Sequence, residues 1–348
     1  MHLLGVGTTS FSRTGRTTRE LAQQAAAAAL ADAGLSAGDV SAVTVATGGE
    51  PDSGAAFELL GDRAGRPLPP PCELGLAALY AAWRAVASGE SDVVLCLGHD
   101  PSPATGDPPA LDELAEAAEA YMGRSGATEG HFARVAAKNR AQGADNPRAP
   151  RNGPPADAGA VLASDVLVWP LRRLMVAAPS QGAAAVVLAA RDLGRRGGAS
   201  APRLRACVLL DAGAGGRAVT ARAARLAYNA ARLGPEDVDC AEIDHPTAAG
   251  EIAAYEALEL APDGHGPELV ESGFTALGGV VPVNTSGGAL AQGLTAGAAG
   301  IVQLCELGWQ LRGEAGRRQV AGARVGLSLA GGHAGRDGVV ALTILSLD

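Results

Sequence analysis

The feature that constrains this chain most is an internal repeat. Residues 31–45 (ADAGLSAGDVSAVTV) resemble residues 229–243 (NAARLGPEDVDCAEI) without a gap, so that Leu35 matches Leu233, 198 positions further on (233 − 35 = 198). Both copies have the pattern of a helix end, a turn, an Asp-Val pair and a strand. A chain that contains the same βαβ unit twice is expected to form two similar halves about a pseudo-twofold axis, with a site at their junction.

Strand and helix patterns alternate along the chain, which is typical of α/β proteins. The segment Leu21–Ala33 is predicted to be an Ala-rich helix closed by Gly34, and Leu74–Ser88 a second helix. The other predicted helices are Leu114–Met122, His131–Gln142, Thr220–Leu233 and Ala249–Leu258. The predicted strands are Leu3–Gly7, Val40–Ala46, Val93–Leu97, Ala183–Ala189, Leu204–Leu210 and Cys240–Ile243.

The repeat also predicts how the chain divides. The second copy begins near residue 216, which gives an N-terminal half over 1–215, with a loop segment at about 100–165, and a C-terminal half over 216–348. The composition suits this arrangement, because 47% of the residues are hydrophobic, only 3% are aromatic and 48 are Gly. Small side chains let helices lie close to sheets, so we expect tightly packed layers.

Charge and cysteine content exclude several classes of protein. A net charge of −9 argues against nucleic-acid binding, which normally requires a basic surface. We expect no membrane association and a cytoplasmic location, because no apolar run approaches the roughly 20 residues of a membrane span and the N-terminus lacks the basic region of a secretory signal. The five cysteines (Cys72, Cys96, Cys207, Cys240 and Cys305) contain no CxxC pair, so we expect neither a metal site nor a disulfide framework.

Several segments, in the same order, resemble one family. They are RTTRELAQQAAAAALADAGLSAGDVSAV (16–43), CELGLAALYAAWRAVASGESDVVLCLGHD (72–100), HFARVAAKNRAQGADNPRAP (131–150), PSQGAAAVVLA (179–189) and GGVVPVNTSGGALAQGLTAGAAGIVQ (278–303). Together they resemble the thiolase superfamily, specifically the sterol-carrier and lipid-transfer-type thiolases. The resemblance implies duplicated βαβ-rich halves in five αβαβα layers. It also implies an acyltransferase of lipid metabolism that acts on a coenzyme A thioester and has no bound cofactor.

The resemblance places a nucleophile at Cys72. This residue follows Leu-Pro-Pro-Pro and precedes a predicted helix, so it is expected near the helix N-terminus. The positive potential at a helix N-terminus lowers the pKa of a thiol, and backbone N–H groups there can hold an oxyanion. We expect the other four cysteines to be structural.

The histidine positions depart from the family pattern. In active thiolases a histidine or asparagine occupies an HDAF- or NEAF-like turn, where this chain has Asp244 followed by His245 and Pro246. A one-residue shift would restore His245 as the base. Glu242 and Asp244 are an alternative pair of carboxylates, but we expect Glu242 to point away from the site.

A second family histidine is also replaced. The histidine of the GHP-type motif, which polarises the thioester carbonyl, corresponds to Leu294, whose apolar side chain cannot do so. The glycine loop at 328–338 (SLAGGHAGRDG) lacks the second cysteine of some thiolases but contains His333, a candidate replacement base.

The resemblance further implies a set of substrate-binding positions near these residues: Asn284, Gly287, Gly288, Gly331 and Gly332. Backbone N–H groups of the C-terminal glycine loop would contribute to the oxyanion hole. For the glycines of 286–300, close backbone packing is the interpretation that we favour over a phosphate cradle.

Three functions remain open at this point. The first is acyl transfer or Claisen-type carbon–carbon chemistry through Cys72, with His245 or His333 as base. The second is retro-aldol cleavage of a β-hydroxyacyl-CoA, which some lipid-transfer-type relatives without catalytic histidines perform with a small zinc-ribbon/OB-fold partner. The third is a non-catalytic subunit. The family implies a homodimer, or a heterodimer with another thiolase-like chain, and acyl-CoA as the ligand.

Overall fold

The computed structural model describes residues 1–11, 16–48, 66–67, 74–100, 110–149, 156–191, 201–211, 216–332 and 339–347, with only the backbone at 66–67. Two of the predicted catalytic residues, Cys72 and His333, lie outside the described residues. None of the described helices combines the length and the apolar composition that a membrane crossing requires.

The first part of the chain forms a mixed sheet with two helices against it. Its strands are β1 (His2–Thr8), β2 (Ala42–Ala46), β3 (Arg66–Pro67), β4 (Val93–His99) and β7 (Ala183–Ala189), and its helices are α1 (Thr18–Ala33) and α3 (Gly75–Ala87). Strand β2 pairs parallel with β4, β4 pairs antiparallel with β7, and β7 pairs antiparallel with β1. All seven residues of β4 and of β7 are buried, because helices cover both faces of this sheet.

The last part of the chain repeats this plan. Its strands are β8 (Arg203–Asp211), β9 (Cys240–Asp244), β10 (Val325–Gly331) and β11 (Val339–Ser346), and its helices are α7 (Gly216–Ala231), α8 (Ala248–Ala257), α9 (Gly266–Glu271), α10 (Gly288–Gln292) and α11 (Ile301–Arg312). Strand β9 pairs parallel with β10, β10 antiparallel with β11, and β11 antiparallel with β8. A single bridge between His2 and Arg203 joins the two sheets into the order β3-β2-β4-β7-β1-β8-β11-β10-β9.

This strand order is symmetric about the β1–β8 contact. Strands β2, β4, β7 and β1 correspond to β9, β10, β11 and β8, and the pairing directions agree at each step. Helix α7 begins 198 positions after α1 (216 − 18 = 198), and β9 begins 198 positions after β2 (240 − 42 = 198). The predicted repeat therefore has the same elements at the same spacing in both copies. The domain limits at 1–215 and 216–348 remain a prediction.

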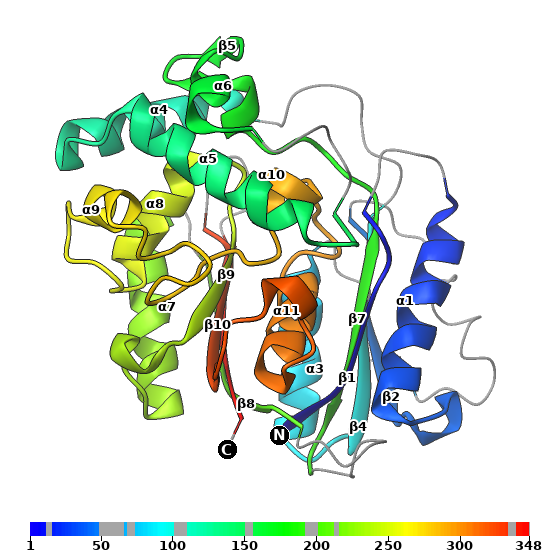
Figure 1. Cartoon of the computed structure of the whole chain (residues 1–348). Coiled ribbons are helices and arrows are strands. Elements are labelled where there is room, and N and C mark those ends of the chain that lie inside the picture. Colours follow the sequence, from blue (N-terminus) through cyan, green and yellow to red (C-terminus); the bar gives the residue numbers. More distant parts are fainter. Residues whose placement is uncertain are drawn as a thin grey trace.

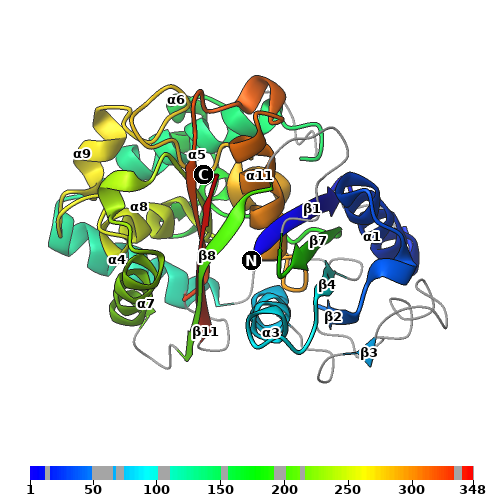
Figure 2. The ribbon, with the colours of Figure 1, turned by 90° about the horizontal axis from the view of Figure 1, so that it is seen from below.

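The elements stack in five layers (Figure 1, Figure 2). Helix α1 contacts the outer face of the first sheet, and α7 contacts β8 and β11 on the outer face of the second. Helices α3 and α11 lie between the sheets and contact strands of both, as well as each other. The predicted αβαβα layering is confirmed.

A helical region between β4 and β7 covers one end of these layers (Figure 1). It comprises α4 (Leu111–Ser125), α5 (Glu129–Ala144), α6 (Ala158–Leu162), β5 (Val166–Val168) and β6 (Leu171–Arg172). Helix α5 contacts α8, α9 and α10 of the second half, and α4 contacts α8. The segment predicted as a loop thus packs over the C-terminal half.

The predicted elements agree with the structure to within a few residues, with one clear exception. The glycine loop expected at 328–338 begins as a strand, because Ser328–Gly331 belong to β10. Ser328 lies in the middle of this strand, with its Oγ 2.5 Å from the Thr343 Oγ1 on β11. The glycines in the segment suggested a loop, but the alternating Leu-Ser-Leu-Ala pattern before them is a buried strand.

Small residues are required where the layers touch. A Cβ placed on Gly98 of β4 would lie 1.9 Å from the carbonyl oxygen of Gly297. We expect Gly98→Ala to lower the free energy of unfolding by about 1–3 kcal/mol, because backbone must move to relieve the overlap. The matched control is Gly123→Ala on α4, where a Cβ has nothing within 4 Å and alanine favours the helix by about 1 kcal/mol. Urea unfolding measures both, and a Gly98→Ala protein as stable as wild type would contradict the packing described here.

Candidate functional site

The N-termini of the two central helices meet at the junction of the halves. Helix α3 begins at Gly75, whose backbone N–H donates to the carbonyl oxygen of Ala296, at 3.0 Å. A Cβ on Gly75 would lie 2.3 Å from the carbonyl oxygens of both Gly297 and Ala299, and Gly300 is the N-cap of α11. The positive ends of both helix dipoles therefore lie against one short segment, 296–300, where negative charge is favoured.

A carboxylate holds this segment in place. The Asp100 carboxylate accepts hydrogen bonds from three consecutive backbone N–H groups, those of Ala296 (2.6 Å), Gly297 (2.9 Å) and Ala298 (2.8 Å). Asp100 directly follows β4 and is buried. Since hydrogen bonds to a charged acceptor are stronger than neutral ones, Asp100 fixes the backbone between α10 and α11 to the end of β4.

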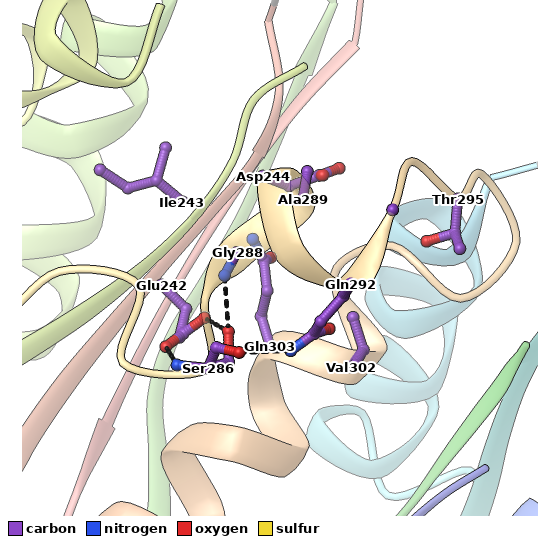
Figure 3. Close-up of a pocket in the computed structure, with 11 residues that line it drawn as sticks. Glu242, Ile243, Asp244, Ser286, Gly288, Ala289, Gln292, Thr295, Val302 and Gln303 are labelled. Atoms are coloured by element: carbon purple, nitrogen blue, oxygen red, sulfur yellow. Dashed lines mark hydrogen bonds between the residues drawn. The ribbon is translucent and has the colours of Figure 1, made fainter. Parts of the chain in front are cut away.

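A small pocket lies beside this segment (Figure 3). Residues from the end of β9, from the 286–295 segment and from the first turn of α11 line it: Glu242, Ile243, Asp244, Ser286, Gly288, Ala289, Gln292, Gly293, Thr295, Val302 and Gln303. The Gln303 Nε2 donates to the Leu329 carbonyl at 3.0 Å, but its Oε1 is buried and accepts no hydrogen bond from a described residue. A buried acceptor without a donor indicates a position for a ligand hydroxyl, amide or water.

The expectation that Glu242 points away from the site was wrong. Glu242 and Asp244 both line the pocket, on the same side of β9. The reason is the period of a strand, in which residues i and i+2 face the same side of the sheet. Ile243, between them, also borders the pocket, but its side chain belongs to the hydrophobic core of the second half.

The environment of Glu242 raises the pKa of its carboxyl group. Its carboxyl group accepts hydrogen bonds from the Ser286 N–H (3.0 Å), the Ser286 hydroxyl (2.5 Å) and the Thr285 hydroxyl (3.2 Å). Burial, together with the nearby charge of Glu306, raises the pKa of Glu242 to about 8. The Glu306 carboxylate accepts two hydrogen bonds from the Arg318 guanidinium group, at 3.0 and 2.8 Å.

A second buried carboxylate, Glu251 on α8, connects the helical region to the junction. Its oxygens accept hydrogen bonds from the Lys138 ammonium group (2.8 Å), the Asn139 amide (2.5 Å), the Asn284 amide (2.8 Å) and the Tyr255 hydroxyl (2.6 Å). A carboxylate whose oxygens accept this many hydrogen bonds is stable when buried. Glu251 thereby holds α5 and the 283–286 segment in a fixed position beside the pocket.

Asn284 occupies a conformation that few residues adopt. Its φ is +56°, in the left-handed region that asparagine tolerates better than most side chains. Its Oδ1 accepts the backbone N–H of Ile243 at 2.7 Å while its amide donates to Glu251. The predicted substrate-binding residue thus fixes the end of β9 next to the pocket, and is not itself among the lining residues.

Comparison with known proteins identifies the family. Residues 215–345 match the family model described as Thiolase C-terminal domain-like. An acetyl-CoA acetyltransferase of Methanothermobacter thermautotrophicus is 33% identical, aligned over 94% of this chain and 94% of its own length. The chain belongs to the thiolase superfamily. Human sterol carrier protein 2 is 30% identical, aligned over 99% of this chain and 71% of that protein.

Solved thiolase-superfamily structures share the fold. The structure titled Ltp2-ChsH2(DUF35) aldolase superimposes with a TM-score of 0.84 at 24% identity, covering 100% of this chain and 97% of that one. Human mitochondrial 3-ketoacyl-CoA thiolase superimposes with a TM-score of 0.73 at 15% identity, covering 99% and 98% of the two chains. The thiolase fold inferred from the sequence motifs is therefore confirmed.

Within this thiolase fold, Asp244 lines the pocket and His245 does not. His245 is half-buried and lies over the first turn of α8, where a Cβ on Gly250 would overlap its ring. The Thr247 N–H donates to its Nδ1 at 3.2 Å. Leu294 is partly buried and packs against the core of the second half, with its backbone paired to Ala178 and Ser180.

The predicted glycines differ in what they do. Gly288 lines the pocket, and its N–H donates to the Ser286 hydroxyl at 3.1 Å. Gly287 allows close approach of α5, because a Cβ there would lie 2.6 Å from the Cα of Gly143. Gly331 and Gly332 end β10 with positive φ, and the Gly332 N–H donates to the Val339 carbonyl at 2.9 Å. The contact between Gly287 and Gly143 agrees with close backbone packing, the interpretation favoured for this segment from the sequence.

The four described cysteines are buried and form no disulfide with one another. Burial raises the pKa of Cys207, Cys240 and Cys305, so these thiols are poor nucleophiles. The expectation that they are structural is consistent with this burial. Among the described residues, no group of three or more His, Cys, Asp or Glu side chains is arranged to hold a metal ion.

Sequence reasoning missed Asp100, Gln292 and Gln303. Asp100 directly follows a buried strand, which is a signal that could have been used, because strand ends gather at one edge of a sheet. Gln303 gave no usable signal, since a polar residue in the first turn of a helix is ordinarily solvated. Its burial arises only because α11 lies between two sheets.

The raised pKa of Glu242 predicts a pH-dependent stability. Folding raises this pKa from 4.5 to about 8, so the folded protein keeps a proton that the unfolded chain releases. The resulting stability is fully present below pH 4.5 and is lost as the pH rises toward 8. Glu242→Gln removes this loss, and we expect its stability relative to wild type to rise by a few kcal/mol over this range.

Thermal unfolding at a series of pH values measures this effect. The control is Glu116→Gln, which removes an exposed carboxylate from α4. Its pH profile should run parallel to that of wild type. A constant difference between Glu242→Gln and wild type across this pH range would show that Glu242 is ionised in the folded protein.

Proposed function

We propose that this chain acts on a coenzyme A thioester at the junction of α3 and α11 and cleaves the Cα–Cβ bond of its acyl chain. The reaction that the site supports best is retro-aldol cleavage of a β-hydroxyacyl-CoA. The observation that carries this proposal is the chemistry of the pocket. Among its described lining residues the ionisable groups are the carboxyl groups of Asp244 and Glu242, and the Gln303 Oε1 is an unused acceptor.

The residues have distinct roles in this reaction. Asp244 accepts the hydrogen bond of the β-hydroxyl group, and the Gln303 Oε1 accepts a hydrogen bond from another N–H or O–H group of the substrate, which orients it. Asp244 removes the hydroxyl proton, the Cα–Cβ bond breaks, and a carbonyl group forms at the former Cβ. The electron pair of the broken bond moves into the thioester as an enolate, which takes this proton from Asp244 at Cα, so that the Asp244 carboxylate is regenerated. The positive ends of α3 and α11 stabilise the negative charge on the enolate oxygen.

The two histidine departures favour this reaction over the usual acyl transfer. Asp244 stands where an active thiolase is expected to have histidine or asparagine, and Leu294 where it is expected to have the histidine that polarises the thioester. Breaking a bond by deprotonating a hydroxyl group needs a base but no acyl-enzyme. One structure with this fold has a title that names it an aldolase.

Acyl transfer through Cys72 is the second candidate. Its support is the position of Cys72 in the sequence, two residues before Leu74, the N-cap of α3. Its base would be His245 or His333. The related acetyl-CoA acetyltransferase bears the name of this activity. We also propose a dimer, with itself or with another thiolase-like chain, and a small OB-fold partner for the aldolase reaction.

Two variants separate these candidates. Incubation with β-hydroxyacyl-CoA thioesters, followed by detection of the released ketone or aldehyde, measures retro-aldol cleavage. We expect Asp244→Asn to lower this rate by about a hundredfold or more, because a positioned base contributes at least that much. Cys72→Ala should leave the rate largely unchanged. Asp112→Asn, which removes an exposed carboxylate from α4, is the matched control.

Mass spectrometry of the intact protein after incubation with acyl-CoA tests the competing acyl-transfer reaction. An acyl adduct that forms on wild type and is lost in Cys72→Ala, without any carbonyl product, would overturn the aldolase proposal in favour of acyl transfer. If neither a carbonyl product nor an acyl adduct forms with acyl chains of any length, with or without copurifying chains, the remaining role is that of a non-catalytic subunit.

A further inference from the structure

A second hollow lies apart from the pocket described above. It is formed by the turn after α5 and the turn after α11, and its charged lining residues are Asp145, Arg148, Glu314, Arg317 and Arg318. None of these residues belongs to the Asp244 pocket. We call it the arginine groove.

Arg148 has an unusual environment for a half-buried charge. Its guanidinium carbon lies 3.8 Å from the centre of the Trp309 ring, so the group is stacked on the indole face. No described carboxylate or carbonyl accepts a hydrogen bond from this guanidinium group. Burial, and the adjacent positive charge of Arg318, lower the pKa of Arg148. The structure thus holds a partly desolvated cation with unused donors at the edge of a groove.

The backbone around Arg148 is fixed, so the side chain is preorganised. The Arg148 N–H donates to the Asn146 Oδ1 at 3.0 Å, and its carbonyl accepts the Phe11 N–H at 2.9 Å. Asn146 in turn donates to the Ser286 carbonyl at 2.9 Å. A ligand that uses Arg148 therefore pays little conformational entropy for ordering it.

The other charges of the groove leave a positive balance. Arg318 is committed to Glu306, and Glu314 pairs with Arg312 at 2.8 Å. Arg317 projects from the opposite wall with 86% of its side chain exposed, and only a 3.5 Å contact to the exposed Asp145 restrains it. Arg317 can therefore turn to a ligand at small cost, since surface ion pairs contribute about 0–1 kcal/mol.

We infer that the arginine groove binds the phosphate group of a small phosphorylated ligand, held between Arg148 and Arg317. The planar guanidinium fork matches the spacing of phosphate oxygens, and two such groups from opposite walls suit a group with several acceptors. This site is separate from the proposed catalytic pocket and does not depend on the proposed function. The phosphate could belong to a free metabolite or to the 3′-phosphate of coenzyme A.

Calorimetric titration of the whole chain with inorganic phosphate tests the site. We expect saturable binding in the millimolar range for wild type, about tenfold weaker in Arg148→Gln and in Arg317→Gln, because each variant removes charge-assisted hydrogen bonds to the phosphate oxygens. The matched control, Arg225→Gln, removes an exposed arginine from α7 and should bind as wild type does. We expect Arg317→Gln to fold because Arg317 is exposed. If Arg148→Gln does not fold, Arg148→Lys replaces it, since lysine keeps the charge but not the planar guanidinium group.

The outcomes are distinct. No saturable binding by wild type, or equal binding by wild type and both groove variants, overturns the proposal. Competition titrations identify the source of the phosphate once binding is established. Displacement of phosphate by coenzyme A but not by 3′-dephospho-coenzyme A supports the coenzyme. No displacement by either supports a separate phosphorylated ligand at the same arginines.

Discussion

The close approach of backbone at the junction of the two halves is the constraint on which the rest of the structure depends. The segment 296–300 lies against the first turn of α3 and against the end of β4, at distances that leave no room for a Cβ on Gly75, Gly98 or Gly297. Asp100 fixes this segment through three backbone hydrogen bonds. Because both central helices begin here, the same contact that closes the fold brings two helix N-termini to one place.

Buried carboxyl groups surround this junction, and each has a different set of hydrogen-bond donors. Asp100 is stabilised by backbone donors, Glu251 by a lysine, two amides and a tyrosine, and Glu306 by an arginine. No described cation pairs with Glu242, and burial beside Glu306 raises its pKa to about 8. The pocket thus combines a carboxyl group of raised pKa with Asp244, in a fold whose active members are expected to use cysteine and histidine. This difference is the basis for proposing aldol-type chemistry.

Much of the fold could be predicted from local patterns. The repeat, the Gly34 cap of α1 and the apolar strands β4 and β7 indicated the duplication and most elements up to α8, because periodicity and capping act within a few residues. The five layers were implied by the family resemblance, and α11, β10 and β11 were not predicted. The site could be predicted only in part. Asn284 and Gly288 lie beside or in the pocket, whereas Glu242 was assigned to the wrong face and Asp100 and Gln303 were missed. Their roles depend on partners between 26 and 198 positions away in the chain, as the Gln303–Leu329, Glu242–Ser286 and Asp100–Ala298 contacts illustrate.

The sequence by itself determined that this chain contains one unit twice, that its halves are built from small residues in thin layers, and that two family histidines are replaced. These properties depend only on residue identity and spacing, which do not change on folding. The tertiary structure alone decided which groups face the pocket, that the pKa of Glu242 is raised and that Arg148 stacks on Trp309. Burial, charge proximity and hydrogen-bond supply exist only once distant segments are packed together, and they determine what the side chains can do.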